Sequence, residues 1–380
     1  MSMSMIGRLA VCLSMVAMLS ACVTRPGPEV LDVPKISTRV TGTRQVTVYV
    51  ATMRARPDPD RNVFTNETAD KLNYAAFTIS IPPVHRPGEI EWPKEGTPDP
   101  AASFVTIQQK VLDPASFHKA ISLAQTGSRS QVGVFVHGFN TSFQEALFRL
   151  AQINADSDDG SRTPILFSWP SEASVTGYLA DKDAATASRD GLSQLLDDLG
   201  RNPAVRKVTL IGHSMGGWLS AEALRQLRLS QKSAIFTKLT VFLAAPDIDV
   251  QVFRSQLAVI GSLSPPMTVL VSKDDRALAV SRLLAGQRRR IGALDVSDPR
   301  VKQAADLGKL EIIDISALST KDQFNHNRFA QVSALAPILA PVEADSSGVK
   351  RSPGTFVLDT LSATLTSPLL LLPKAGQPGP

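Results

Sequence analysis

The chain has 380 residues, of which 43% are apolar and 20% are charged, and its formal net charge is +5. These values are ordinary for a globular protein, and the length allows one large domain or two small ones with a sizeable core. The densest basic run, Arg288–Arg290, fits a solvated surface turn, so we expect no nucleic-acid partner.

The first 22 residues have the pattern of an export signal. Arg8 provides a positive start, residues 9–19 are apolar, and Leu19-Ser20-Ala21-Cys22 forms a small-residue cleavage site that ends in cysteine. The uncharged stretch from Leu9 to Thr24 is shorter than the ~20 residues that a spanning helix needs. We therefore expect no retained membrane segment.

This segment resembles a bacterial lipoprotein signal, in which the cysteine becomes the lipidated first residue. The resemblance implies a lipid, such as palmitate, on Cys22 and an exported protein that is bound to a membrane. Val23 follows, where the inner-membrane retention signal has aspartate, so the resemblance implies outer-membrane sorting with the domain facing the periplasm. The only other cysteine, Cys12, would leave with the signal, which excludes a disulfide or a cysteine metal site. The alternative is a secreted protein with a cysteine here by chance.

Beyond the signal peptide (residues 1–22) we expect a flexible, proline-bearing tether over 23–44, a folded domain over 45–340 and a low-complexity tail over 341–380. Early strands are predicted at 46–52, 77–81 and 104–107, with a long loop over 82–100.

From Val132 onward, continuous apolar runs alternate with helical patterns. The capping box Ser142-x-x-Glu145 begins one helix, and another runs from about 184 to 199. The strands are predicted at 132–136, 164–167, 208–211, 239–244, 267–271 and 310–313. This rhythm predicts a doubly wound, mostly parallel sheet flanked by helices, an α/β fold.

The segment Gly212-His213-Ser214-Met215-Gly216 follows one of these strands and precedes a helical pattern. It is a G-x-S-x-G nucleophile elbow in its proper context, and it predicts a serine hydrolase of the α/β-hydrolase fold with Ser214 as nucleophile. We expect Gly212 and Gly216 to be glycines because a Cβ there would collide with the neighbouring strand or helix, and Ser214 to be reachable by substrate. The alternative is a glycine-rich turn with an idle serine.

The α/β-hydrolase triad follows the chain order nucleophile, acid, histidine. The histidines are His85, His118, His137, His213 and His326. Only His326 follows Ser214, so it must be the base that takes the serine proton. His137 precedes the nucleophile, and we interpret it as an orienting residue.

The acid should follow a strand between Ser214 and His326. Asp275 is preferred, and Asp274 and Asp247 remain open. The acid would fix the imidazole tautomer and stabilise the imidazolium. Backbone N–H groups of Met215 and Phe139 would form the oxyanion hole.

Metal hydrolysis by His137, Asp247 and Asp249 is the rival chemistry, but the sequence has no paired ligand spacing and no phosphate-binding glycine motif. We expect no metal and no cofactor.

With these residues in view, the chain resembles a bacterial α/β hydrolase family of largely unassigned physiological role, often described as esterase- or lipase-like. The matching segments run in order from Val46 to Phe329: 48–54, 135–140, 167–171, 177–179, 187–190, 212–217, 243–249 and 275–278. The resemblance implies Ser214, Asp275 and His326 as the triad. One departure is that the family's histidine usually follows a glycine, whereas Asn325 stands here.

We expect a lipid-anchored serine esterase that cleaves carboxylic esters of lipid-like molecules through an acyl-enzyme on Ser214. The alternatives are an acyltransferase, thioesterase or peptidase with the same triad, or a non-catalytic envelope lipoprotein. The sequence leaves the oligomeric state open. It places any lid in the 82–100 loop or the 170–190 segment.

Overall fold

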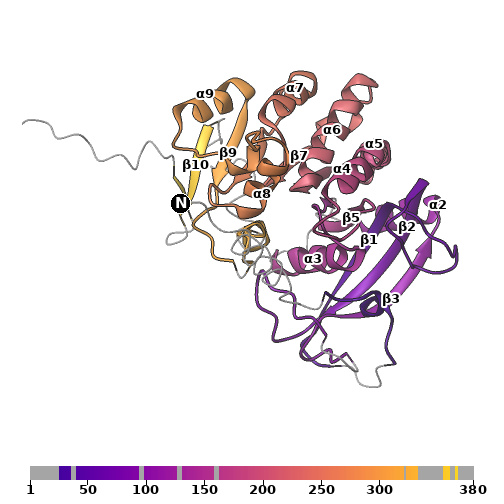
Figure 1. Ribbon diagram of the computed structural model, residues 1–380. Coiled ribbons are helices and arrows are strands. Elements are labelled where there is room, and N and C mark those ends of the chain that lie inside the picture. Colours follow the sequence, from indigo (N-terminus) through magenta and orange to yellow (C-terminus); the bar gives the residue numbers. More distant parts are fainter. Residues whose placement is uncertain are drawn as a thin grey trace, which may run out of the picture.

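The computed structural model describes residues 25–35, 40–93, 98–125, 131–157, 162–320, 322–332, 354–359 and 364–366. These residues form one 11-stranded sheet in the order β11-β10-β9-β8-β7-β6-β4-β5-β1-β2-β3. Figure 1 shows this sheet crossing the molecule from β10 and β9 on one side to β2 and β3 on the other, with helices on both faces. The predicted α/β-hydrolase architecture is confirmed.

The strands divide into an antiparallel edge and a parallel centre. The antiparallel edge consists of β1 (Arg44–Arg54), β2 (Thr68–Ile81) and β3 (Val105–Leu112). The parallel strands are β4 (Gln131–Val136), β5 (Arg162–Ser168), β6 (Lys207–His213), β7 (Leu239–Ala244), β8 (Met267–Val271), β9 (Leu310–Asp314) and β10 (Gly354–Asp359). Strand β11 (Thr364–Thr366) pairs antiparallel with β10. Because the central strands are parallel, the loops after their carboxyl ends share one sheet edge.

Each face of the sheet has its own core. One core packs the sheet against α2 (Pro114–Ala124), α5 (Arg189–Arg201), α6 (Met215–Leu229), α7 (Val250–Ile260) and α9 (Pro299–Gly308). The other packs it against α3 (Phe143–Asp156), α10 (Phe329–Val332) and the short helix η1 (Pro28–Leu31). The remaining helices are α4 (Tyr178–Ala187), α8 (Arg276–Leu284), η2 (Ala234–Thr237) and η3 (Ile291–Ala293).

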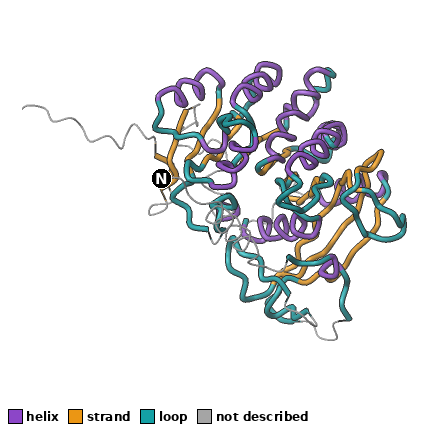
Figure 2. Tube along the Cα trace, viewed as in Figure 1, coloured by secondary structure: helices purple, strands orange, loops and turns teal. Residues whose placement is uncertain are grey.

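The central strands lie where their apolar runs predict them, to within one or two residues at each end. The single helix predicted over 184–199 is instead two helices, α4 and α5, which meet at Ser188. The Ser188 hydroxyl donates to the carbonyl of Ala184 at 2.8 Å. Such back-bonding to the preceding turn bends helices. The long loop after β2 is observed as irregular chain over residues 82–93 and 98–104 (Figure 2).

Both ends of the fold differ from the predicted domain boundaries. Residues 25–35 are not a free tether, because η1 packs on the sheet and buries Leu31. The domain does not end at 340, since β10 extends the sheet beside β9 within the predicted tail. The polar, proline-bearing composition around η1 favours a linker, but its contacts with the sheet fix it in place. The predicted signal peptide, Cys22 and the apolar run 369–372 lie outside the described residues. In the described part of the chain, no helix is both long enough and apolar enough to cross a bilayer.

Candidate active site

Ser214 lies at the sharp turn between β6 and α6, as the elbow motif predicts. Its backbone has φ +53° and ψ −118°, which is a strained conformation for a residue with a side chain. A Cβ on Gly216 would lie 2.3 Å from the carbonyl oxygens of Val136 and His137. A Cβ on Gly212 would lie 2.6 Å from Ser220 Oγ and 2.8 Å from the carbonyl oxygen of Gly216. The two glycines therefore leave space for the neighbouring strand and helix to approach the turn.

The nucleophile candidate is more enclosed than the sequence suggests. Ser214 is only 4% exposed, and its carbonyl oxygen accepts from the backbone amides of Gly217 at 2.9 Å and Asp247 at 3.1 Å. Its own amide donates to the carbonyl of Ala244 at 2.9 Å. The turn is thus fixed from two neighbouring elements, and its backbone is held in place.

His326 and Asp275 contact each other across the carboxyl edge of the sheet. His326 Nδ1 lies 2.6 Å from Asp275 Oδ2, and the Asp275 side chain is fully buried. The other carboxylate oxygen accepts from the amide of Leu278 at 2.9 Å, because Asp275 is also the N-cap of α8. The helix cap holds the carboxylate in place beside the imidazole.

The loop that carries His326 is built around Asp322. One Asp322 oxygen accepts from the amides of His326 at 2.8 Å and Asn327 at 3.1 Å. Asn325, which precedes the histidine, has φ +58°. Glycine adopts this left-handed conformation most readily, and asparagine is among the few other residues that tolerate it. Asn325 can therefore adopt the left-handed conformation that this turn requires.

The two alternative acids have other partners. Asp274 is paired with Arg328, whose hydrogen bonds hold the pKa of Asp274 at about 2. Asp247 is buried and accepts from Ser281 Oγ at 2.6 Å and Tyr178 Oη at 2.8 Å.

The same buried network corrects the interpretation of the basic run. Arg290 Nε lies 3.0 Å from Asp247 Oδ1, and Arg290 is only 8% exposed. Arg290 is therefore part of the core, and only Arg288 and Arg289 are exposed residues of a surface turn.

The ring of His213 connects the elbow to the histidine loop. It lies 4.6 Å from the His326 ring and 4.2 Å from the Phe329 ring, measured between centroids. Burial, together with the neighbouring His326, lowers the pKa of His213 well below its usual value, so its ring is neutral. Among the described residues, the Ser214 hydroxyl makes no hydrogen bond to His326. Catalytic hydrogen bonds are often long without substrate and tighten in the complex.

The pKa of His326 is raised above 6.5. Burial by itself lowers it, but the hydrogen bond and charge of Asp275, with the charges of Asp247 and Asp322, outweigh burial. The Asp275 carboxylate therefore stabilises the imidazolium that forms when His326 accepts a proton.

His137 lies in the loop that begins after β4. Its Nδ1 is 2.9 Å from the carbonyl oxygen of Gly138, and its Nε2 is 3.1 Å from that of Trp169. The ring also stacks on the Trp169 ring at 4.8 Å. Burial, with the charge of Arg54, lowers the pKa of His137 to about 3. A neutral ring with these contacts fits the orienting role predicted for it.

The two predicted oxyanion-hole residues flank Ser214. Met215 is the first residue of α6, where helix amides have no intrahelical acceptor. Phe139 follows Gly138, and a Cβ on Gly138 would lie 3.0 Å from Ser214 Cβ. Neither the Met215 nor the Phe139 amide has an acceptor among the described residues.

Sequence reasoning assigned no role to Arg54, the last residue of β1, which makes hydrogen bonds to the loop after β4. The buried guanidinium donates to Ser168 Oγ at 3.1 Å and to the carbonyls of Thr141 at 3.0 Å and Ser171 at 3.2 Å. Burial lowers its pKa to about 10, so it stays charged. The sequence alone gives no reason for a buried charge at Arg54.

Sequence reasoning also missed Asp181, a second charged residue that binds this loop. It accepts from the amide of Asn140 at 3.0 Å and from Ser171 Oγ at 2.6 Å. Asp181 belongs to α4, so the 170–190 segment borders the site. Phe139 also packs edge-to-face on Tyr178 of that helix at 5.4 Å.

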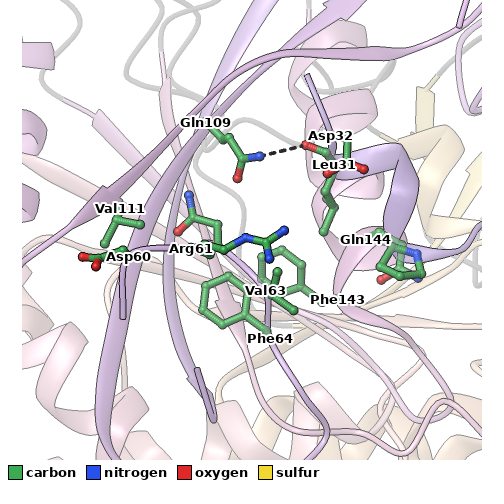
Figure 3. Close-up of a pocket in the computed structure, with 12 residues that line it drawn as sticks. Leu31, Asp32, Asp60, Arg61, Val63, Phe64, Gln109, Val111, Phe143 and Gln144 are labelled. Carbon is green, nitrogen blue, oxygen red and sulfur yellow. Dashed lines mark hydrogen bonds between the residues drawn. The ribbon is translucent and has the colours of Figure 1, made fainter. Parts of the chain in front are cut away.

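A pocket of about 210 Å³ lies elsewhere in the molecule (Figure 3). It is lined by η1, the 60–64 loop, β3 and the start of α3, and Gln109 crosses it to donate to the carbonyl of Leu31. Ser214, Asp275 and His326 are not among its lining residues. Within the described residues, no group of three or more His, Cys, Asp or Glu side chains could hold a metal ion.

A family model covers most of the α/β core. Residues 113–342, more than half of the chain, match a family described as alpha/beta hydrolase of unknown function (DUF900). The chain belongs to this family. The matched range includes Ser214, Asp275 and His326.

Among solved structures, the chain is similar to a candidate hydrolase from Agrobacterium vitis S4. The two share 12% identity at a TM-score of 0.30, over 60% of this chain and 86% of that one. The search of curated proteins finds no match.

Proposed function

We propose that this α/β hydrolase is a serine esterase that uses Ser214, His326 and Asp275 to cleave carboxylic esters. The observation that carries the proposal is the 2.6 Å contact between His326 Nδ1 and Asp275 Oδ2, on the sheet edge where the elbow presents Ser214. A histidine oriented by a buried carboxylate near a strained serine is the arrangement that activates a hydroxyl as a nucleophile.

In the first half-reaction, Ser214 Oγ attacks the ester carbonyl carbon while His326 Nε2 takes the hydroxyl proton. The tetrahedral oxyanion accepts hydrogen bonds from the Met215 and Phe139 amides. The C–O bond to the alcohol then breaks, and His326 gives its proton to the leaving oxygen. Asp275 keeps the proton of the neutral imidazole on Nδ1 and stabilises the imidazolium.

In the second half-reaction, water attacks the acyl-enzyme with His326 again as base, which releases the acid and restores Ser214. Thioester, amide and acyl-transfer reactions would pass through the same intermediate. An ester is favoured because a protein anchored to a membrane would meet lipid esters.

The lipoprotein signal and the location are part of the same proposal. Lipid on Cys22 would hold the domain at the outer membrane, facing the periplasm. Each buried CH₂ contributes roughly 0.8 kcal/mol to membrane binding, so more than one acyl chain is needed for a stable anchor.

The test is hydrolysis of p-nitrophenyl esters of increasing acyl length by the wild-type chain and by Ser214→Ala and His326→Gln variants. We expect wild-type turnover, with a large loss in both variants and unchanged circular dichroism. Folded wild-type protein that hydrolyses none of the esters would refute esterase function. Acyl transfer to an added alcohol in place of hydrolysis would favour the acyltransferase alternative.

A further inference from the structure

We propose that the rim of the candidate active site formed by α4 and α8 docks onto the surface of an anionic lipid bilayer. If the rim docks on a membrane, the substrate is an acyl ester of a membrane lipid. This substrate assignment rests on the proposed function. The docking itself rests on exposed apolar side chains, on basic residues beside them and on the position of the N-terminal segment.

Six large apolar side chains are exposed on the loops and helices around the site. We call this set the α4–α8 rim. Its members, with their exposed fractions, are Val175 (68%), Leu179 (77%), Val280 (48%), Leu283 (59%), Leu284 (62%) and Phe324 (50%).

The elements of the α4–α8 rim are joined to one another by hydrogen bonds. Tyr178 Oη at the start of α4 lies 3.1 Å from Ser281 Oγ of α8. The amide of Arg276, at the start of α8, donates to the carbonyl of Phe324 at 2.9 Å. The exposed apolar residues of the rim therefore belong to neighbouring elements beside Asp275 and His326. Isolated exposed apolar residues are normal, whereas a gathered set marks an interaction surface.

Basic residues accompany the rim. Arg282 in α8 is exposed, and no Asp or Glu occurs between residues 276 and 290. Arg288 and Arg289 in the following turn are also exposed, and they lie 3.9 Å from Asp249 and 4.0 Å from Asp298, respectively. Arginines beside exposed apolar side chains suit a surface of anionic headgroups over acyl chains. A neutral protein partner would not explain the basic residues.

The N-terminal segment is fixed beside the same rim. The Arg25 guanidinium contacts Glu145 Oε2 at 2.6 Å, Asn140 Oδ1 at 2.8 Å and the carbonyl of Ala173 at 2.5 Å. Asn140 follows Phe139 in the candidate oxyanion loop, and Ala173 belongs to the loop that carries Val175.

Cys22 precedes Arg25 by only three residues in the sequence. Lipid on Cys22 would consequently enter the bilayer beside the α4–α8 rim and turn the candidate site toward the membrane.

The test compares two leucines with nearly equal exposure. Leu179 on the rim is 77% exposed, and Leu307 at the end of α9 is 78% exposed. Helix α9 ends just before the start of β9, so Leu307 lies at the opposite sheet edge. Full-length Leu179→Cys and Leu307→Cys proteins are labelled with the environment-sensitive fluorophore NBD and reconstituted into vesicles of phosphatidylcholine with phosphatidylglycerol. The parent chain measures background labelling of Cys12 and Cys22.

With vesicles present, we expect the fluorophore at 179 to shift to the blue and its iodide quenching to fall several-fold, with no change at 307. Equal responses at the two positions would overturn the docking. Shielding of the fluorophore at 179 without vesicles would also overturn the docking. If that shielding rises with protein concentration, the rim binds a second copy of the chain; if it does not, the chain's own tail covers the rim.

Charge is tested with a matched pair of exposed arginines. Arg282→Glu should lower the shielding at 179 on vesicles with phosphatidylglycerol, whereas Arg254→Glu on α7, with the same charge change, should not. If both variants behave like the parent, recognition of anionic lipid is wrong.

The substrate is tested separately from the proposed function. A Leu179→Ser, Leu283→Ser double variant should keep hydrolysis of soluble p-nitrophenyl acetate and lose several-fold activity on vesicle phospholipid. If the parent hydrolyses the soluble ester but no vesicle lipid, the substrate assignment is wrong. If the parent hydrolyses neither, the proposed function and the lipid substrate both fail, and the shielding at 179 alone decides the docking.

Discussion

Replacing Asp275 by asparagine tests how His326 is oriented. The change keeps the size of the side chain and its amide oxygen can still cap α8 by accepting from Leu278, as Asp275 Oδ1 does at 2.9 Å. The NH₂ group then faces His326 Nδ1, where the carboxylate oxygen stood at 2.6 Å. Two donors cannot face each other, so the imidazole proton moves to Nε2 and the ring can no longer accept the serine proton. A wrong tautomer in such a triad costs about 10⁴ in kcat, or about 5.5 kcal/mol of transition-state stabilisation.

The assay is kcat/KM on a p-nitrophenyl ester, with thermal melting as a check on folding. Asp274→Asn is the matched control, because it removes a charge one residue away that pairs with Arg328 and has a half-exposed side chain. We expect this control to keep activity within about tenfold, because Arg328 is buried but keeps its hydrogen bonds to the carbonyl of Leu318 and to Ser272 Oγ. The reasoning is refuted if Asp275→Asn stays within tenfold of wild type, or if Asp247→Asn, folded, shows the larger loss.

Three further predictions follow from the same geometry. Gly216→Ala forces a Cβ to within 2.3 Å of the carbonyl oxygens of Val136 and His137 and should lower the unfolding free energy by about 1–3 kcal/mol or more. Gly133→Ala should be tolerated, because the nearest atom to the new Cβ is 3.9 Å away. Equal melting temperatures of the two variants would contradict this. Activity should rise with pH through a value above 6.5, because His326 acts as base only when neutral and its pKa is raised, and a limb below 6.5 would argue against it. The free energy of unfolding should fall below pH 6.5 by up to about 1.4 kcal/mol per pH unit for each buried neutral histidine. The reason is that His137 and His213 bind protons in the unfolded chain but not in the folded one, where the pKa is about 3 at His137 and well below 6.5 at His213. Urea melts that do not change between pH 6.5 and 5 would exclude this.

The sequence predicts the parallel centre of the fold well, because a buried parallel strand needs a continuous apolar run. The run at residues 267–271, for example, coincides with β8. Strand β10 is missed because it joins the sheet only through its pairing with β9, a contact that local composition does not encode. The break between α4 and α5 falls at Ser188, within a pattern that otherwise favours a continuous helix.

In the candidate site, too, local motifs are predicted from the sequence and long-range contacts are not. The elbow is a local motif, and the chain order of the triad restricts the base to His326. The supporting residues Arg54 and Asp181 are buried charges whose partners come from distant segments, so neither spacing nor composition predicts them. The contact of Arg25 with the candidate oxyanion loop is not predicted either, because a single side chain makes it from a segment with the composition of a linker.

The most direct measurement is reaction of the folded chain with a fluorophosphonate probe, followed by peptide mass spectrometry. We predict a single adduct on the peptide that contains Ser214, absent in a Ser214→Ala protein with an unchanged melting temperature and slowed in His326→Gln. A folded wild-type protein without an adduct at Ser214, or a Ser214→Ala protein that still reacts, would contradict the assignment of Ser214 as nucleophile.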